Sequence, residues 1–326
     1  MPEINKKRKV KASWELIGRC VVSLISVFLT QFALYMVPHL FPLSSLLTLL
    51  SLSVLVLMAV VGFGRCCKKL VGVRASAPAF VFFNILSIWC VHIAVVRQAI
   101  SPLLDIVFNM ELLMLVTGLC CILSSDPGFI MHQSSSLEKH EVEAHSEELE
   151  LLSCGMPQDF PVEGSSVLVQ RARYCRQCKA YVKGFDHHCP AFGNCIGQGN
   201  HALFIFLLVG FIISECSYIT CSSQFSTKSH ILGKAEWEAS LSGNLAISTM
   251  LFSCLQVVWQ VAFLVWHVYC ICFNIKTDEW INWRRYPEFQ LIVPPQPGQP
   301  VPEIRFTNPY NKGILWNLKE FLTAKR

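Results

Sequence analysis

Six long apolar segments constrain this chain more than any other feature of its sequence. A helix needs about 20 apolar residues to cross the roughly 30 Å hydrocarbon core of a bilayer. Charged residues make up 15% of the chain, against about 25% in a typical soluble domain. We therefore predict an all-α multi-pass membrane protein with about six transmembrane helices. The predicted spans are residues 16–37, 42–64, 78–96, 103–123, 202–221 and 245–273.

The placement of Lys and Arg predicts how these spans are oriented. Basic residues crowd the N-terminal segment 1–15 and the connection 65–74, whereas the connection 38–41 carries none. Because connections rich in Lys and Arg stay in the cytosol, we expect the chain to start there. With six spans, the segments 124–201 and 274–326 then also face the cytosol.

Three polar segments outside the spans have distinct compositions. The linker 124–170 contains an acidic stretch, 138–150, which is typical of a solvated linker. The connection 222–244 is expected in the lumen or outside the cell. The tail contains a proline-rich spacer, 294–302, which predicts an extended conformation. Apolar residues at helical spacing follow it and predict a short amphipathic helix, lying on the membrane or on the bundle.

The basic run from Asn5 to Val10 has two interpretations. It has the composition of a nuclear-import signal, and it is also the ordinary basic flank of a first membrane span. We favour the flank, because clustered Lys and Arg also suit anionic lipid at the cytosolic face of a membrane. The expected partner of this segment is the lipid bilayer, and no nucleic-acid partner is expected.

The segment 171–201 contains the residues for a metal site and for a reactive thiol. Four of them follow the spacing C-x2-C-x9-H-x6-C, which can close a tetrahedral zinc site. Protein would fill all four positions, so the site would be structural. From spacing alone, Cys189 is an equally good fourth ligand, and that assignment leaves no nucleophile. The predicted ligands are Cys175, Cys178, His188 and Cys195.

The unbroken run Asp186, His187, His188 and Cys189 helps to separate these two assignments. In an extended strand alternate residues share a face, so His187 and Cys189 would point together while His188 points away toward the metal. Asp186 could then bend back to the other nitrogen of His187. Such an order is the nucleophile, base and orienting-acid pattern of cysteine enzymes, in which a neighbouring imidazolium activates the thiol.

This run resembles the hallmark of the DHHC-type protein S-acyltransferases (palmitoyltransferases). The resemblance continues through Pro190, Asn194 and Cys195, and then Gly197 and Asn200. It covers roughly residues 103–317. Further elements similar to those of the family are Asp126-Pro127-Gly128, Lys276-Thr277-Asp278-Glu279 and Asn308-Pro309-Tyr310.

The resemblance implies a two-step reaction with long-chain acyl-CoA as the acyl donor. Cys189 would attack the thioester, with His187 as the base and Asp186 orienting it. The acyl-enzyme would pass its chain to a cysteine thiol of a cytosolic or membrane-associated substrate protein. The residues implied to brace the active loop are Thr277, Glu279 and Asn317. Those that could receive the CoA phosphates are Arg171, Arg173, Arg176, Lys179 and Lys183.

The chain departs from the family pattern at a few positions. Family members usually bind two zinc ions, but Tyr174 and Tyr181 stand where a His and a Cys ligand are expected. We therefore predict one zinc ion, with aromatic packing of these tyrosines in place of the other. Ala191 replaces a tryptophan, and Lys276 replaces the first threonine of a Thr-Thr-x-Glu element. None of these changes removes a predicted catalytic side chain.

The leading hypothesis is an integral-membrane protein S-acyltransferase. We expect it in the Golgi, the ER or the plasma membrane, with the catalytic loop in the cytosol. A second hypothesis is a catalytically silent relative that binds acyl chains or client proteins. A third is a zinc-bearing transporter, which six spans alone suggest. The halves of the chain show no clear pair of corresponding helices broken by Gly or Pro, which argues against transport.

Overall fold

The structure, a computed structural model, describes residues 2–42, 44–71, 74–130, 171–231, 241–294 and 303–323. The predicted acidic stretch 138–150 lies outside the described residues, and so do parts of the connection 222–244 and of the spacer 294–302. Side chains of the basic N-terminal segment up to residue 12 also lie outside the described part.

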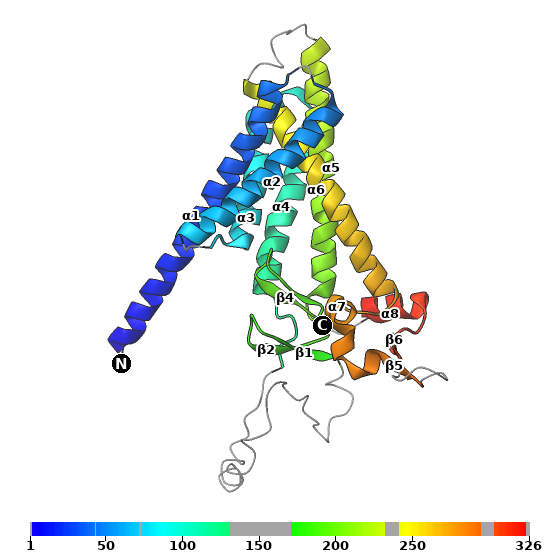
Figure 1. Cartoon of the computed structure of the whole chain (residues 1–326). Helices are drawn as coiled ribbons and strands as arrows, with labels where there is room; N and C mark the ends of the chain where they lie inside the picture. The colour runs from blue at the N-terminus through cyan, green and yellow to red at the C-terminus, as the bar shows by residue number, and fades with distance from the viewer. Residues whose placement is uncertain are drawn as a thin grey trace.

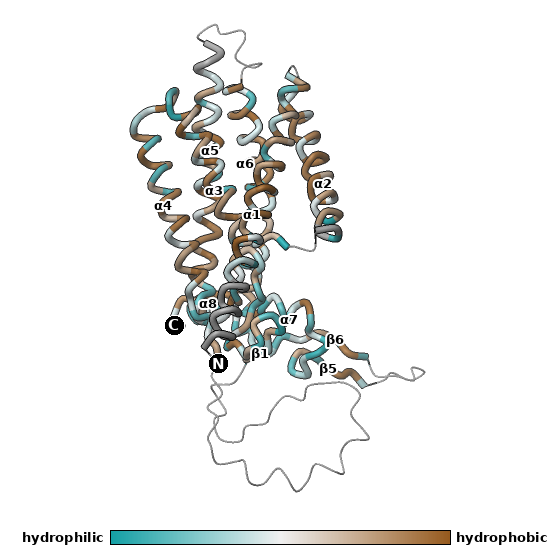
Figure 2. Tube along the Cα trace, turned by 90° about the vertical axis from the view of Figure 1, so that its left-hand side faces the viewer, coloured by the Kyte–Doolittle hydropathy of each residue, from teal (hydrophilic) through white to brown (hydrophobic). Residues whose placement is uncertain are grey.

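Six long helices run side by side in a bundle (Figure 1). Each contains a stretch long and apolar enough to cross a membrane, which confirms the predicted all-α multi-pass class. At most 33% of the most apolar stretch of any helix is buried within the protein, which leaves most of that stretch for lipid to cover. Figure 2 shows that hydrophobic residues predominate along these helices. The helices are α1 (Pro2–Leu40), α2 (Leu46–Val71), α3 (Ala77–Ala94), α4 (Pro102–Ser124), α5 (His201–Ile231) and α6 (Leu241–Cys272).

The core of the bundle follows one face of α4. Its buried residues recur every three or four positions, the period of a helix face that packs on its neighbours. That face contacts α5, which also packs on α6, while α1 contacts α2, α3 and α6. The same buried cluster extends through Phe204 and Phe192 to Cys189 at one end of the bundle. The buried residues of α4 are Phe108, Leu112, Leu115, Leu119 and Ile122.

Two small antiparallel hairpins lie against that end of the bundle (Figure 1). In the second hairpin His187 pairs with Ile196 and His188 pairs with Cys195. The first hairpin has Cys175 at the end of one strand, and Ala180 is its partner across the turn. These pairs bring residues from different parts of the loop together. The strands are β1 (Ala172–Cys175), β2 (Ala180–Lys183), β3 (His187–Cys189) and β4 (Asn194–Ile196).

The segment after α4 packs tightly on these hairpins. The Asp126 carboxylate accepts hydrogen bonds from the backbone N–H groups of Gly128 and Phe129. Opposite this turn, a Cβ added at Gly197 would lie 2.4 Å from the Pro127 carbonyl oxygen, and one at Gly199 would lie 2.3 Å from that of Asp126. Only glycine fits such a close approach of two backbones.

The C-terminal tail folds back against the end of α6. It comprises α7 (Thr277–Asn282), the hairpin of β5 (Gln290–Val293) and β6 (Glu303–Phe306), and α8 (Ile314–Thr323). The amide of Asn317 is 2% exposed and connects α8 to α6, because its Nδ2 donates to the Cys272 carbonyl at 2.8 Å. Most apolar side chains of α8 point outward, with Leu315 83% exposed. An amphipathic helix of this kind suits a membrane surface.

The first prediction concerns the Asn317 connection. Asn317→Ala removes the hydrogen bond to Cys272 and the one that Asn317 accepts from the Lys312 backbone N–H. We expect the free energy that holds α8 to fall by about 2 kcal/mol, because buried polar groups lose their partners. Hydrogen exchange of residues 314–323 should therefore accelerate. The control is Lys319→Ala on the exposed side of α8, and equal exchange in the two variants would contradict the prediction.

Candidate functional site

Three thiols and one imidazole converge between the two hairpins. The Nδ1 atom of His188 lies 3.4 Å from the sulfur of Cys178, 3.6 Å from that of Cys195 and 3.7 Å from that of Cys175. A tetrahedral zinc ion with ordinary bond lengths places its sulfur and nitrogen ligands about 3.5 Å apart. The four predicted ligands are therefore brought together in a geometry compatible with zinc.

The protonation chemistry of these thiols also fits a cation. Burial raises the pKa of Cys178 and of Cys195, and the neighbouring thiols raise the pKa of Cys195 further. A bound divalent cation would reverse this trend, since it stabilises thiolates directly. Without a cation these sulfurs would stay protonated as thiols, and zinc binding would release their protons. The donor set therefore fits a structural zinc ion.

Cys189 lies outside this thiol cluster. Two groups of the described residues could hold a metal ion, the thiol cluster and the trio Asp186, His201 and His267, and neither includes the Cys189 sulfur. Cys189 is 6% exposed and belongs to the buried cluster of the helix bundle, with Phe192 and Phe204. Cys175 and Cys195 instead belong to a separate cluster inside the loop, with Val182 and Phe185. The alternation along β3 thus separates His188 from Cys189.

His187 and Asp186 form a close pair beside the bundle core. The Nδ1 atom of His187 lies 2.7 Å from Oδ2 of Asp186, whose side chain is fully buried. The other ring nitrogen, Nε2, is buried and has no hydrogen-bond partner in the described part of the chain. Burial alone would lower the pKa of His187, but the hydrogen bond to Asp186 and the interaction with Cys189 raise it to about 9.

Asp186 is held from several sides. Its carboxylate Oδ1 accepts from the Thr277 backbone N–H at 3.0 Å, and its carbonyl accepts from the Asp278 backbone N–H at 2.9 Å. Burial alone would raise the pKa of Asp186, but the hydrogen bond from His187 and nearby positive charges hold it well below its usual range. The carboxylate is therefore ionised, and it joins β3 to the start of α7.

The three residues predicted to brace the loop lie at this junction and at the tail. Thr277 contacts Asp186 through its backbone, while its hydroxyl is buried with no hydrogen-bond partner among the described residues. Glu279 is 1% exposed and accepts from the Lys276 backbone N–H at 2.8 Å, which caps α7. Asn317 is farther along the chain and connects α8 to α6.

The basic residues predicted to receive CoA phosphates lie in three different settings. Arg171 donates from Nε to Glu279 at 2.8 Å and stacks over the Tyr310 ring at 4.1 Å. Arg173 forms an ion pair with Glu288. Both arginines therefore connect β1 to the tail. The remaining three are Arg176 and Lys179, which are exposed near the β1–β2 turn, and Lys183, which lines a pocket.

Two further histidines lie beside the Asp186–His187 pair. His267 of α6 is fully buried, its ring centroid lies 5.6 Å from that of His187, and its Nδ1 lies 3.9 Å from the Asp186 carboxylate. His201 lies 6.2 Å from His267 between ring centroids. His201 directly follows the Asn200 of the motif, which was a usable signal. His267 sits inside an apolar span, where nothing in the local sequence indicates its neighbours.

Tyr174 and Tyr181 contact each other across the first hairpin. They are register partners on β1 and β2, and their ring centroids lie 5.2 Å apart. Both side chains remain largely exposed, at 50% and 40%. Their rings thus pack on the strand face where the sequence predicts a lost pair of metal ligands.

Comparison with known proteins gives one family and several relatives. A family model described as DHHC palmitoyltransferase matches residues 159–284. "Probable protein S-acyltransferase 1" of Arabidopsis thaliana is 32% identical over 223 residues, which are 62% of this chain and 59% of that protein. "Probable protein S-acyltransferase 3" of the same plant is 27% identical over 282 residues, 80% of this chain and 58% of that protein.

A human relative is matched over a smaller part of its length. "Palmitoyltransferase ZDHHC17" of Homo sapiens is 29% identical over 210 residues, which are 60% of this chain and 30% of that protein. The chain therefore covers less than two thirds of the length of each of these three relatives.

The second prediction concerns the metal. We expect about one zinc ion per chain in the purified protein, and the same content in Cys189→Ser and His187→Ala, because neither side chain lies in the thiol cluster. His188→Ala should lose the ion. Elemental mass spectrometry measures the content. Loss of zinc from Cys189→Ser would place its sulfur on the metal, and two ions per chain would refute the single site.

The third prediction concerns the buried ion pair of Arg171 and Glu279. Arg171→Met leaves a carboxylate that is 1% exposed without its cation, which should cost about 3–5 kcal/mol of stability. The matched variant is Arg173→Met, whose partner Glu288 is 32% exposed, and this change should cost about 1 kcal/mol or less. Thermal unfolding in detergent compares them. Equal losses would show that burial does not govern these pairs.

Proposed function

We propose that this chain is a DHHC-type protein S-acyltransferase, a proposal supported by the match of residues 159–284 to that family model and by the similarity to named S-acyltransferases. It moves a long-chain acyl group such as palmitoyl from acyl-CoA to cysteine thiols of substrate proteins. One observation carries this proposal: His188 joins the thiol cluster, whereas Cys189 packs with the bundle beside the Asp186–His187 pair. The sulfur is thereby free to react.

The first step forms an acyl-enzyme on Cys189. Since Nδ1 of His187 is hydrogen bonded to Asp186, Nε2 is the nitrogen that takes the proton of the thiol. The sulfur attacks the thioester carbonyl of acyl-CoA, and the carbon–sulfur bond to coenzyme A breaks. The CoA thiolate leaves with the proton from His187. The ionised Asp186 stabilises the imidazolium between these transfers.

The second step transfers the acyl group to the substrate protein. His187 accepts the proton of the incoming cysteine thiol, whose sulfur attacks the acyl carbonyl on Cys189. The Cys189 thiolate then leaves and recovers a proton from His187, so the enzyme returns to its starting state. No oxidant or other co-reactant is needed.

The surroundings of Cys189 support an acyl substrate. Its sulfur belongs to an apolar cluster that includes Phe204, Leu119 and Ile122, at the end of the bundle. Burial of an acyl chain there would be favourable by about 0.8 kcal/mol for each methylene. The phosphates of CoA would remain in water near the loop. Arg176 and Lys179 suit them best, since both are exposed while Arg171 and Arg173 are engaged in ion pairs.

The zinc ion has a structural role in this proposal. One ion would be held by the three cysteines and His188, and four protein ligands leave no position for a substrate. It would fix the loop that carries Cys189 and supply no step of the reaction. The loop would face the cytosol, where reducing conditions preserve thiols and where CoA and client proteins are present. The membrane would be that of the Golgi, the ER or the cell surface.

The fourth prediction tests the acyl-enzyme directly. Purified protein is incubated with labelled palmitoyl-CoA, and protein-bound label that hydroxylamine releases is measured. The parent should acquire label, and Cys189→Ser should acquire none. His187→Ala and Asp186→Asn should slow labelling, the first by about 10²–10⁴-fold, because a general base is lost.

The control for this experiment is another cysteine. Cys216→Ser removes an exposed thiol of α5 and should label like the parent. Equal label on the parent and on Cys189→Ser would remove Cys189 from the reaction. Absence of label from a zinc-loaded, folded parent would instead favour a silent relative that only binds acyl chains or clients.

A further inference from the structure

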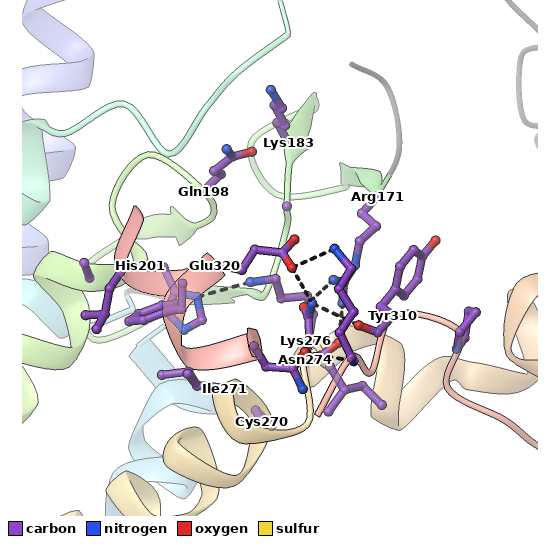
Figure 3. A pocket seen from close by; sticks show the side chains of 18 of the residues that line it. Arg171, Lys183, Gln198, His201, Cys270, Ile271, Asn274, Lys276, Tyr310 and Glu320 are labelled. Atoms are coloured by element: carbon purple, nitrogen blue, oxygen red, sulfur yellow. Dashed lines mark hydrogen bonds and ion pairs between the residues drawn. The ribbon is translucent and has the colours of Figure 1, made fainter. Parts of the chain in front are cut away.

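A pocket of about 800 Å³ lies between the loop hairpins, the ends of α5 and α6, and α8 (Figure 3). Its lining includes His201 and Cys270 but none of Asp186, His187 and Cys189. The pocket is thus a neighbour of the candidate catalytic site and not part of it. Its size is that of ordinary ligand sites, about 300–1,000 Å³.

The pocket has more cationic than anionic residues in its lining. Four cationic residues line it against two carboxylates, those of Glu288 and Glu320. Glu288 pairs with Arg173, and Glu320 pairs with Lys312 at 2.9 Å. Arg171 pairs with Glu279, so two of the four cations, Lys183 and Lys276, have no ion pair within the described part of the chain. The cationic residues are Arg171, Lys183, Lys276 and Lys312.

Lys276 is one of the two lining lysines without an ion pair in the described part of the chain. Its Nζ lies 3.4 Å from Nδ1 of His201, and no carboxylate of the described residues forms an ion pair with it. Figure 3 shows its side chain extending toward His201 inside the pocket. Burial lowers the pKa of the Lys276 ammonium and the Arg171 guanidinium lowers it further, while the Asp186 and Glu279 carboxylates offset part of this effect. An anion in the pocket would offset both effects.

Part of the pocket lining is apolar and exposed. It includes Phe206 of α5, which is 68% exposed, and Leu322 of α8, which is 69% exposed. Phe206 lies within the membrane-crossing stretch His201–Thr227. A ligand that fills the pocket therefore has an anionic end against Lys276 and an apolar end that continues along α5 into the bilayer.

We propose that this pocket binds the phosphate head group of an anionic phospholipid at the membrane surface. The phosphate lies against Lys276, and an acyl tail follows Phe206 and Leu322. Coenzyme A offers the same phosphate chemistry, but its thioester has to reach Cys189, which packs in a different buried cluster and does not line this pocket. Lys276 stands where the family element has threonine, so the site is a property of this chain's own sequence.

The experiment measures lipid binding by the full-length protein in detergent, by native mass spectrometry. The probes are dioctanoyl phosphatidic acid, dioctanoyl phosphatidylcholine and soluble coenzyme A. Phosphatidic acid should bind at least tenfold more tightly than phosphatidylcholine. Lys276→Thr should weaken phosphatidic acid about tenfold, since a charge-assisted contact to phosphate is lost. The matched control, Lys319→Gln, removes a charge from α8 outside the pocket and should bind like the parent.

Two results would overturn the proposal. One is equal affinity for phosphatidic acid in the parent and in Lys276→Thr. The other is displacement of phosphatidic acid by coenzyme A together with weaker coenzyme binding in Lys276→Thr, which would assign the pocket to the acyl donor. Leu322→Gln offers a second variant if Lys276→Thr does not fold. It should weaken dioctanoyl phosphatidic acid but leave glycerol 3-phosphate binding unchanged.

The same measurements on Cys189→Ser keep this inference separate from the proposed function. That variant should bind phosphatidic acid like the parent, because acyl transfer plays no part in lipid binding. Failure of lipid binding with intact acyl-enzyme formation rejects only the lipid site. Lipid binding without acyl-enzyme formation rejects only the proposed reaction.

Discussion

The buried carboxylate of Asp186 is the interaction on which the candidate site depends. It accepts a hydrogen bond from His187 and one from the backbone at the start of α7. A buried ionised group is costly without such partners. The loop that carries Asp186 and the tail that donates to it therefore hold each other in position. The neighbouring pair of Arg171 and Glu279 strengthens the same junction from β1. A tail that begins directly after α6 therefore fixes a loop that ends directly before α5.

The thiol cluster with His188 fixes the conformation of the other side of this loop. The hairpins have only a small apolar cluster of their own, in which two of the four members are cysteines at the metal-binding positions. Zinc binding in such a small unit can supply folding free energy on the order of 10 kcal/mol. Strand alternation along β3 then places His188 in the metal cluster and Cys189 toward the bundle. The alternation of side chains along β3 thus both directs His188 to the metal cluster and leaves the Cys189 thiol unbound.

Much of this arrangement can be predicted from local sequence signals. The apolar segments are long enough to indicate membrane helices, and the Cys and His spacing indicates the metal cluster, since both depend on residues that are near in sequence. Contacts between distant segments are not accessible in this way. The pairing of Arg171 with Glu279 joins positions 108 residues apart. Nothing in the sequence around Arg171 indicates that it forms an ion pair inside the protein. Likewise, in the sequence His267 is only a polar residue within an apolar span, whereas in the fold it lies beside Asp186.

In the proposed acyl transfer, the burial of Cys189 would also limit which acceptors can approach it. With 6% of its surface exposed at the end of a membrane bundle, this sulfur is out of reach of a thiol on a rigid, folded surface. An acceptor would have to insert an extended, flexible segment near the membrane surface. The choice of substrate protein would then depend on how far its cysteine lies from the bilayer and on how flexible the chain around that cysteine is. A strict recognition sequence would be unnecessary.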